Sequence, residues 1–153
     1  MKLREPMPEL SDAKVWLNGE VTRKDLVGEI PTLIHFWSIS CHLCKKAMPQ
    51  VNELRNKYKD KLNVISIHMP RSEEDRNLVE IKRVAVEHNM TQPIYVDDDD
   101  DHTLTNRFEN QYVPSYYLFD REGKLRHFQI GGSGMNMLEK RVNRMFNEDG
   151  KPE

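Results

Sequence analysis

The sequence has few cysteines, no long apolar run and no excess of one charge. Two cysteines in 153 residues are too few for the disulfide framework of a small secreted domain. No stretch approaches the ~20 apolar residues of a transmembrane helix, and no apolar segment follows the charged N-terminus as in a secretory signal peptide. The formal net charge of -2 gives no electrostatic reason to expect a nucleic acid. The sequence therefore predicts a cytoplasmic protein that binds neither a nucleic acid nor a membrane.

What the chain does contain is enough apolar sequence for one core. A hydrophobic content of 37% over 153 residues fits a domain that needs no structural disulfides or metals. We see no internal repeat and no linker, so we expect a single domain over residues 1–153. We expect a small domain with such a polar surface to be a monomer.

The two cysteines stand two residues apart, in Cys41-His42-Leu43-Cys44. A structural zinc site needs four ligands, usually a second cysteine pair or two closely spaced histidines, and the sequence offers neither. In a reducing compartment, a lone pair with this spacing beside a strand–helix pattern is typical of a redox motif. The spacing alone is only moderately specific, so the flanking sequence has to decide.

The pair lies between a predicted buried strand and a predicted amphipathic helix. Residues 32–37 form a nearly continuous apolar, aromatic and β-branched run, which is typical of a strand buried on both faces. After Cys44, apolar residues recur at helical spacing: Ala47, Val51, Leu54 and Tyr58. Residues 63–69 alternate in polarity and predict the next strand. The pair is thus expected where a strand turns into a helix within a βαβ unit, the place where α/β sheets collect their functional groups.

This position gives the two cysteines different expected roles. Only a thiolate attacks a disulfide, and a free thiol with a pKa of about 8.5 is mostly protonated near neutral pH. The unpaired N–H groups and the dipole at a helix N-terminus favour the anion. We therefore expect Cys41 to be the nucleophile and Cys44, one turn inward, to resolve the mixed disulfide. His42 follows the nucleophile and is expected to add to the local field.

The rest of the chain predicts alternating helices and strands. Residues 72–75 resemble a capping box that opens a helix ending near Asn89, and residues 97–101, five consecutive aspartates, predict a solvated loop. The other expected elements are a hairpin of residues 15–17 and 20–22 around Asn18-Gly19, a strand at 93–96, a short helix containing Leu104 and Phe108, a hairpin of residues 115–119 and 125–130, and a terminal helix after Gly134.

This order of elements resembles the thioredoxin superfamily from Pro31 to the last helix. Pro49, five residues after Cys44, matches the proline that bends the active-site helix of thioredoxins, and Val113-Pro114 matches their cis-proline dipeptide facing the dithiol. The N-terminal hairpin and the extra helical segment before Pro114 resemble the TlpA/ResA-like branch. The resemblance implies an α/β thioredoxin fold, with a central mixed sheet flanked by helices, a hairpin extension over residues 1–30 and a core over residues 31–148.

The resemblance also implies an activity and its site. It implies thiol–disulfide exchange with client proteins, with no cofactor beyond Cys41 and Cys44. Pro114 would face the dithiol, and the surface that contacts a client would include Trp37, His42 and Val113.

Because the sequence departs from the thioredoxin pattern at several positions, the family's reduction potential, proton path and client proteins do not transfer to this chain. His35 stands where thioredoxins place a buried aspartate, and we expect it either to move protons at Cys44 or to be an ordinary core histidine. Ser40 replaces the usual tryptophan before the first cysteine, and His42-Leu43 replaces Gly-Pro. Ala47 replaces the glutamate of ResA-like proteins.

Two other functions remain open at this point. A thiol peroxidase of related fold has the pattern Pro-x-x-x-Thr/Ser-x-x-Cys; Ser38 is correctly placed before Cys41, but Ile34 stands at the proline position. A copper-binding module would use Cys41, Cys44 and a distant histidine as soft ligands. A second cysteine so close to the first favours disulfide exchange over both.

Overall fold

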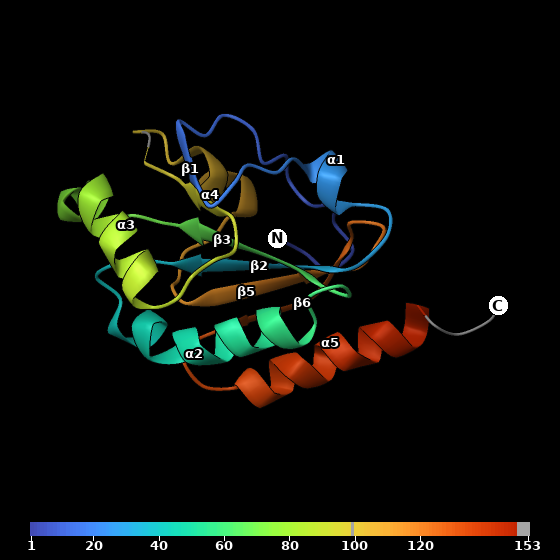
Figure 1. Cartoon of the computed structure of the whole chain (residues 1–153). Coiled ribbons are helices and arrows are strands. Elements are labelled where there is room, and N and C mark those ends of the chain that lie inside the picture. Colours follow the sequence, from blue (N-terminus) through green and yellow to red (C-terminus); the bar gives the residue numbers. More distant parts are fainter. Residues whose placement is uncertain (99, 150–153) are drawn as a thin grey trace.

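The computed structural model describes residues 1–98 and 100–149, and within them six strands form one mixed sheet (Figure 1). The strands are β1 (Val15–Leu17), β2 (Thr32–Trp37), β3 (Asn63–His68), β4 (Ile94–Val96), β5 (Ser115–Phe119) and β6 (Leu125–Ile130). The helices are α1 (Arg23–Leu26), α2 (His42–Lys57), the 3-10 helix η1 (Glu73–Arg76), α3 (Leu78–Glu87), α4 (Thr103–Phe108) and α5 (Met135–Asp149). Their order in the sheet is β1-β4-β3-β2-β5-β6. This is the thioredoxin-like α/β fold that the sequence predicts.

The central strand β2 carries the chain to the candidate site. It pairs in parallel with β3 and antiparallel with β5, and all six of its residues are buried, as its continuous apolar run predicts. The helix α2 follows after a short connection, so its N-terminus stands at the carboxyl end of β2. Pro49 lies inside α2, as expected from the resemblance.

Two apolar layers cover the two faces of the sheet. The helices α2 and α5 lie side by side under one face, while α1, α4 and the N-terminal segment cover the other (Figure 1). Because side chains alternate along β2, Leu33 and Trp37 pack toward the first layer, and Ile34 and Phe36 toward the second. The dithiol belongs to the first layer.

The prediction of an N-terminal hairpin is wrong. β1 does form, but it pairs antiparallel with β4, with Val15 opposite Val96, and the residues after Gly19 form no return strand. The side-chain amide of Asn18 donates hydrogen bonds to the carbonyls of Met90 and Gln92 at 2.9 and 3.0 Å, which directs the turn against the chain before β4. An Asn-Gly turn alone cannot show which strand its neighbour will pair with.

The expected capping box at residues 72–75 is also wrong. Ser72 makes no capping bond with its side chain, and residues 73–76 form the short η1 instead. The helix α3 begins at Leu78, where the side chain of Asn77 accepts a hydrogen bond from the backbone N–H of Glu80 at 3.2 Å. Asp75 is buried, and its carboxylate accepts a hydrogen bond from the backbone N–H of Arg71. The segment therefore turns inward before α3 starts.

The aspartate run differs from a solvated loop at its first residue. Asp97 is only 1% exposed, and its carboxylate accepts hydrogen bonds from the backbone N–H groups of Leu104 and Thr105 and from the Thr105 hydroxyl, which donates at 2.6 Å. Asp97 therefore pairs with free N–H groups at the start of α4. Asp100 and Asp101 are exposed, as expected, and residue 99 lies outside the described residues.

The remaining predicted elements are confirmed. β5 and β6 form the expected hairpin, α4 contains Leu104 and Phe108, and α5 buries Met135, Leu138, Val142 and Met145. In the part of the chain that the structure describes, no helix is long and apolar enough to cross a membrane.

Candidate active site

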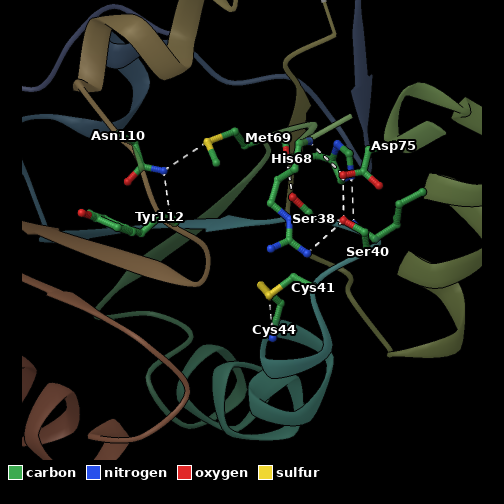
Figure 2. Close-up of a disulfide and its surroundings, with 11 residues drawn as sticks. Ser38, Ser40, Cys41, Cys44, His68, Met69, Asp75, Asn110 and Tyr112 are labelled. Atoms are coloured by element: carbon green, nitrogen blue, oxygen red, sulfur yellow. Dashed lines mark hydrogen bonds between the residues drawn. A yellow bond between two sulfur atoms is a disulfide. The ribbon is translucent and has the colours of Figure 1, made fainter. Parts of the chain in front are cut away.

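Cys41 and Cys44 form a disulfide at the N-terminus of α2, with their Cα atoms 5.2 Å apart (Figure 2). Cys41 occupies the N-cap position, and its Sγ accepts a hydrogen bond from the backbone N–H of Cys44 at 3.1 Å. That N–H is one of the donors that an α-helix leaves unpaired in its first turn. When the disulfide is reduced, the same donor and the helix dipole favour an anionic sulfur on Cys41.

The two sulfur-bearing residues differ in access. Cys41 is 3% exposed and Cys44 is fully buried. A client approaching from solvent therefore meets Cys41 first, although Cys41 is covered more closely than an outward-pointing residue would be. This asymmetry agrees with the roles expected for the pair.

The connection between β2 and Cys41 is held by the end of β3. The Ser38 hydroxyl donates to the carbonyl of Met69, and the backbone N–H of Met69 donates to the carbonyl of Trp37 at 2.8 Å. The backbone N–H of Ile39 donates to Nε2 of His68 at 3.2 Å. These bonds fix the chain just before the nucleophile.

Trp37 supports this connection from below. Its indole is fully buried and meets the ring of His68 edge to face, with the ring centroids 5.0 Å apart. A side chain without exposed surface does not touch a client directly, so the structure does not support the expected contact. His42, in contrast, is exposed on the first turn of α2.

The Val113-Pro114 peptide bond is cis, as the resemblance implies. Pro114 is buried, and Val113 is partly buried and packs against both apolar layers. The loop that carries them is held by Asn110, whose side-chain amide donates to the carbonyl of Tyr112 at 2.9 Å. Figure 2 shows Asn110 and Tyr112 on the opposite side of the dithiol from Ser40.

Asn110 is a positioning residue that sequence reasoning missed. Its Oδ1 accepts hydrogen bonds from the hydroxyls of Ser115 at 2.8 Å and Tyr117 at 2.9 Å, and its Nδ2 lies 3.4 Å from Sδ of Met69. Because the backbone of Met69 also binds the connection before Cys41, Asn110 links the proline loop to the cysteine loop. The only sequence signal was a polar residue four positions before Pro114.

His35 is fully buried in the middle of β2, stacked on the ring of Tyr116 with the centroids 5.3 Å apart. Its Nδ1 lies 2.9 Å from the hydroxyl oxygen of Ser66, which also accepts a hydrogen bond from Gln92. The tautomer of the ring decides which of the two groups, Nδ1 or the Ser66 hydroxyl, donates in this hydrogen bond. Nε2 has no hydrogen-bond partner in the described part of the chain.

Burial keeps this imidazole neutral. It lowers the pKa of His35 to about 3, because a charged ring would lose its hydration without gaining a counter-ion. The ring is thus a poor base for a thiol proton, but its Nε2 remains able to form one further hydrogen bond.

A second group that sequence reasoning missed adjoins Cys41. Ser40 donates its hydroxyl to the buried carboxylate of Asp75 at 2.8 Å, and the guanidinium of Arg71 donates to the Ser40 oxygen. No motif marks this group, since its members come from two loops that are separated along the chain.

The described residues contain no group of three or more His, Cys, Asp or Glu side chains placed to hold a metal ion. A copper module would need such a third ligand beside Cys41 and Cys44. A thiol peroxidase would need the Ser38 hydroxyl next to its reactive cysteine, but this hydroxyl donates its hydrogen bond to the carbonyl of Met69. The geometry thus favours disulfide exchange.

Comparison with known proteins gives the same answer. A thioredoxin-like family model matches residues 29–125. The thiol-disulfide oxidoreductase YkuV of Bacillus subtilis (strain 168) is 69% identical over 148 residues, covering 97% of this chain and 99% of YkuV. Protein DipZ of Mycobacterium bovis is 31% identical over 150 residues, which cover 95% of this chain but 21% of DipZ.

A solved structure agrees in fold as well as in sequence. The solution structure of a thioredoxin-like protein in the oxidised form superposes with a TM-score of 0.88 at 69% identity, covering 97% of this chain and 99% of the other. With the Cys41–Cys44 pair at the start of α2, the chain belongs to the thioredoxin-like family and is one of its thiol–disulfide oxidoreductases.

Proposed function

We propose that this protein reduces disulfides in client proteins, with Cys41 as the attacking sulfur and Cys44 as the resolving one. The observation that carries the proposal is the asymmetry of the pair: Cys41 caps the helix and is 3% exposed, whereas Cys44 lies one turn inward with no exposed surface. The first sulfur is thus both activated and reachable, and the second is reachable only from within the protein.

The exchange balances in two steps. The Cys41 thiolate attacks one sulfur of the client disulfide, forms a mixed disulfide and releases the other client sulfur as a thiolate. The Cys44 thiol then loses its proton and attacks Sγ of Cys41, which restores the internal disulfide and releases the second client sulfur. The client gains two electrons, its sulfurs take two protons, and a dithiol reductant must return two electrons to the Cys41–Cys44 pair.

The neighbouring residues have supporting roles in this proposal. The backbone at Val113 pairs with an extended client segment, next to Pro114, while exposed His42 lines the other side of the dithiol. Trp37 acts indirectly, by supporting the loop before Cys41. His35 acts on Cys44 from the buried side.

The direction of exchange depends on the compartment as well as on the site. We propose that the protein works in the reducing cytoplasm, as a monomer whose residues 1–153 form a single domain. In that compartment the cysteine pair is held reduced and therefore drives the reduction of client disulfides. Cell fractionation and the redox state of the pair in the cell test this location directly.

The two cysteine variants test the proposed mechanism. With a disulfide-bonded model protein such as insulin and a dithiol reductant, Cys41→Ser should abolish reduction above the uncatalysed rate. Cys44→Ser should instead accumulate a mixed disulfide that mass spectrometry assigns to Cys41. Equal behaviour of the two variants would contradict the division of roles. Peroxide consumption faster than disulfide reduction, or stoichiometric binding of copper with high affinity, would favour the alternatives.

A further inference from the structure

A polar cluster of Ser40, Arg71 and Asp75 lies directly before the nucleophile. Asp75 is only 2% exposed, and one of its oxygens, Oδ2, accepts hydrogen bonds from the Ser40 hydroxyl and from the backbone N–H of Arg71, both at 2.8 Å. The guanidinium of Arg71 donates to the Ser40 oxygen through Nε at 3.2 Å and Nη2 at 3.0 Å. Ser40 thereby connects a buried carboxylate to an exposed cation.

The donors and acceptors of this cluster fit only one arrangement. A serine hydroxyl has one proton and two lone pairs, and arginine has no acceptor. The Ser40 proton therefore goes to Asp75, and its lone pairs face the guanidinium. Asp75 thus orients the Ser40 hydroxyl, which in turn holds the end of an otherwise mobile side chain in one place.

That place adjoins Cys41. Ser40 is its neighbour in the chain, and in Figure 2 Ser40 lies between Cys41 and Asp75. The carboxylate of Asp75 is therefore on the buried side of Ser40. The side chain of Arg71 is on the exposed side, from which a client would approach.

We propose that Ser40 and Asp75 are positioning residues that hold the guanidinium of Arg71 beside Cys41, where its charge favours the Cys41 thiolate. The inference rests on the proposed function in that Cys41 is taken as the attacking sulfur. It assigns a positive charge that acts on Cys41 to a loop outside the Cys-x-x-Cys motif. The step that Arg71 promotes is loss of the Cys41 proton to solvent, which yields the nucleophile, and no further reactant is needed.

Other titratable groups lie close to Cys41 and have to be separated from Arg71. His42 and Lys45 lie on the first turn of α2 and Lys46 directly after it, while the neutral ring of His68 and the carboxylate of Asp75 bind the loop before Cys41. A plain structural role for the cluster, namely holding the loop in place, would alter stability without altering the acidity of Cys41. The test therefore measures acidity and redox equilibrium as well as stability.

The experiment uses the full chain with four variants: Arg71→Met, Arg71→Lys, Ser40→Ala, and the combination of Ser40→Ala with Arg71→Met. The exposed Arg144 on α5 supplies the matched control, Arg144→Met, which changes the net charge equally and lies toward the far end of the helix layer. The pKa of Cys41 is obtained from the pH dependence of its alkylation by iodoacetamide. The redox equilibrium is measured against glutathione at a pH above that pKa.

Arg71→Met should raise the pKa of Cys41 by about half a unit, because a neighbouring opposite charge is lost. It should shift the glutathione equilibrium about threefold toward the disulfide, or roughly 15 mV at 29.6 mV per tenfold change. Arg71→Lys should restore most of the pKa. Ser40→Ala should raise it by less, and should add nothing once Arg71 is already Met, since residues that act through one another are not additive.

Arg144→Met should change neither quantity. An unchanged pKa and equilibrium in Arg71→Met, or equal shifts in Arg71→Met and Arg144→Met, would overturn the proposal, as would full additivity of Ser40→Ala and Arg71→Met. Alkylation needs no client, so this result judges Arg71 by itself. Failure of the proposed function would appear separately, as unchanged client reduction in Cys41→Ser.

Discussion

The backbone N–H of Ile39 donates a hydrogen bond to Nε2 of His68, and the two atoms are 3.2 Å apart. A ring nitrogen that accepts carries no proton, so this bond requires the neutral form of His68 with its proton on Nδ1. Burial lowers the pKa of His68 to about 4, while the negative charge of Asp75 opposes that shift. The loop before Cys41 is therefore held in place by a histidine that has to stay neutral.

Acid should weaken the folded state through the two buried histidines, His35 and His68. Both have lowered pKa values in the folded protein, about 3 and about 4, against about 6.5 when unfolded. The stabilisation that comes from keeping both rings neutral is complete above about pH 6.5. It is lost as the pH falls toward the pKa values of the folded protein, because only the unfolded chain gains protons in that window. Each histidine should cost about 1.4 kcal/mol of unfolding free energy per pH unit between about pH 6 and pH 4.

Urea unfolding of the oxidised protein over this pH range measures that slope. His68→Gln offers an amide oxygen to the N–H of Ile39 and cannot be protonated, so the variant should lose the share of the slope that belongs to His68. A slope that is the same in His68→Gln and the wild type would contradict the assignment.

The role of His35 can be separated by the two steps of exchange. His35 lies on the face of β2 that packs with Cys44, and its Nε2 has no partner among the described residues. We expect His35→Leu to slow resolution of the mixed disulfide about tenfold, through loss of the unpaired ring nitrogen as a hydrogen-bond partner for Cys44, and to leave the first attack by Cys41 nearly unchanged.

Stopped-flow measurement of both steps tests this expectation. Ser66→Ala serves as the matched control, since it removes the bond to Nδ1 but keeps the ring. Equal slowing of both steps, or loss of stability alone, would identify His35 as a core residue without a catalytic role.

Asn110 should matter for both stability and client exchange. Asn110→Ala leaves the buried hydroxyls of Ser115 and Tyr117 without their acceptor and releases the carbonyl of Tyr112. The expected loss of unfolding free energy is about 1–3 kcal/mol, since buried groups are left unpaired. Client reduction should slow as well, because the loop that carries Val113 is no longer held.

Ser115→Ala is the control for this variant. It removes one of the same hydrogen bonds but keeps the hydrogen bond from the Asn110 side chain to the carbonyl of Tyr112. It should cost less stability and keep client reduction close to normal. Full activity in Asn110→Ala at wild-type stability would show that the loop is held by other contacts.

Much of the fold could be predicted because its signals are local. The apolar run of residues 32–37, the helical spacing after Cys44 and the turn between β5 and β6 each reflect the burial pattern of one element. The cysteine pair could be predicted for the same reason, since Cys41 and Cys44 belong to one helix turn whose N-terminus is defined by the strand before it. The cis bond at Pro114 was predicted by resemblance alone, as most X-Pro bonds are trans.

The N-terminal hairpin shows why other features could not be predicted. Asn18-Gly19 is a strong local turn signal, yet the partner of β1 is β4, which lies more than seventy residues later. Pairing of this kind depends on which edge of the sheet remains open after the core has formed. No local pattern carries that information.

By itself, the sequence determined the chemistry of this protein: a cysteine pair at a strand-to-helix junction, with the first sulfur at the helix N-terminus. Only the tertiary structure decided what surrounds the pair. It buried Trp37, linked Asn110 to the proline loop and placed Arg71 on Ser40 through Asp75. The physical reason is that a helix turn forms among neighbours in the chain, whereas hydrogen bonds between loops form only when packing brings distant segments together.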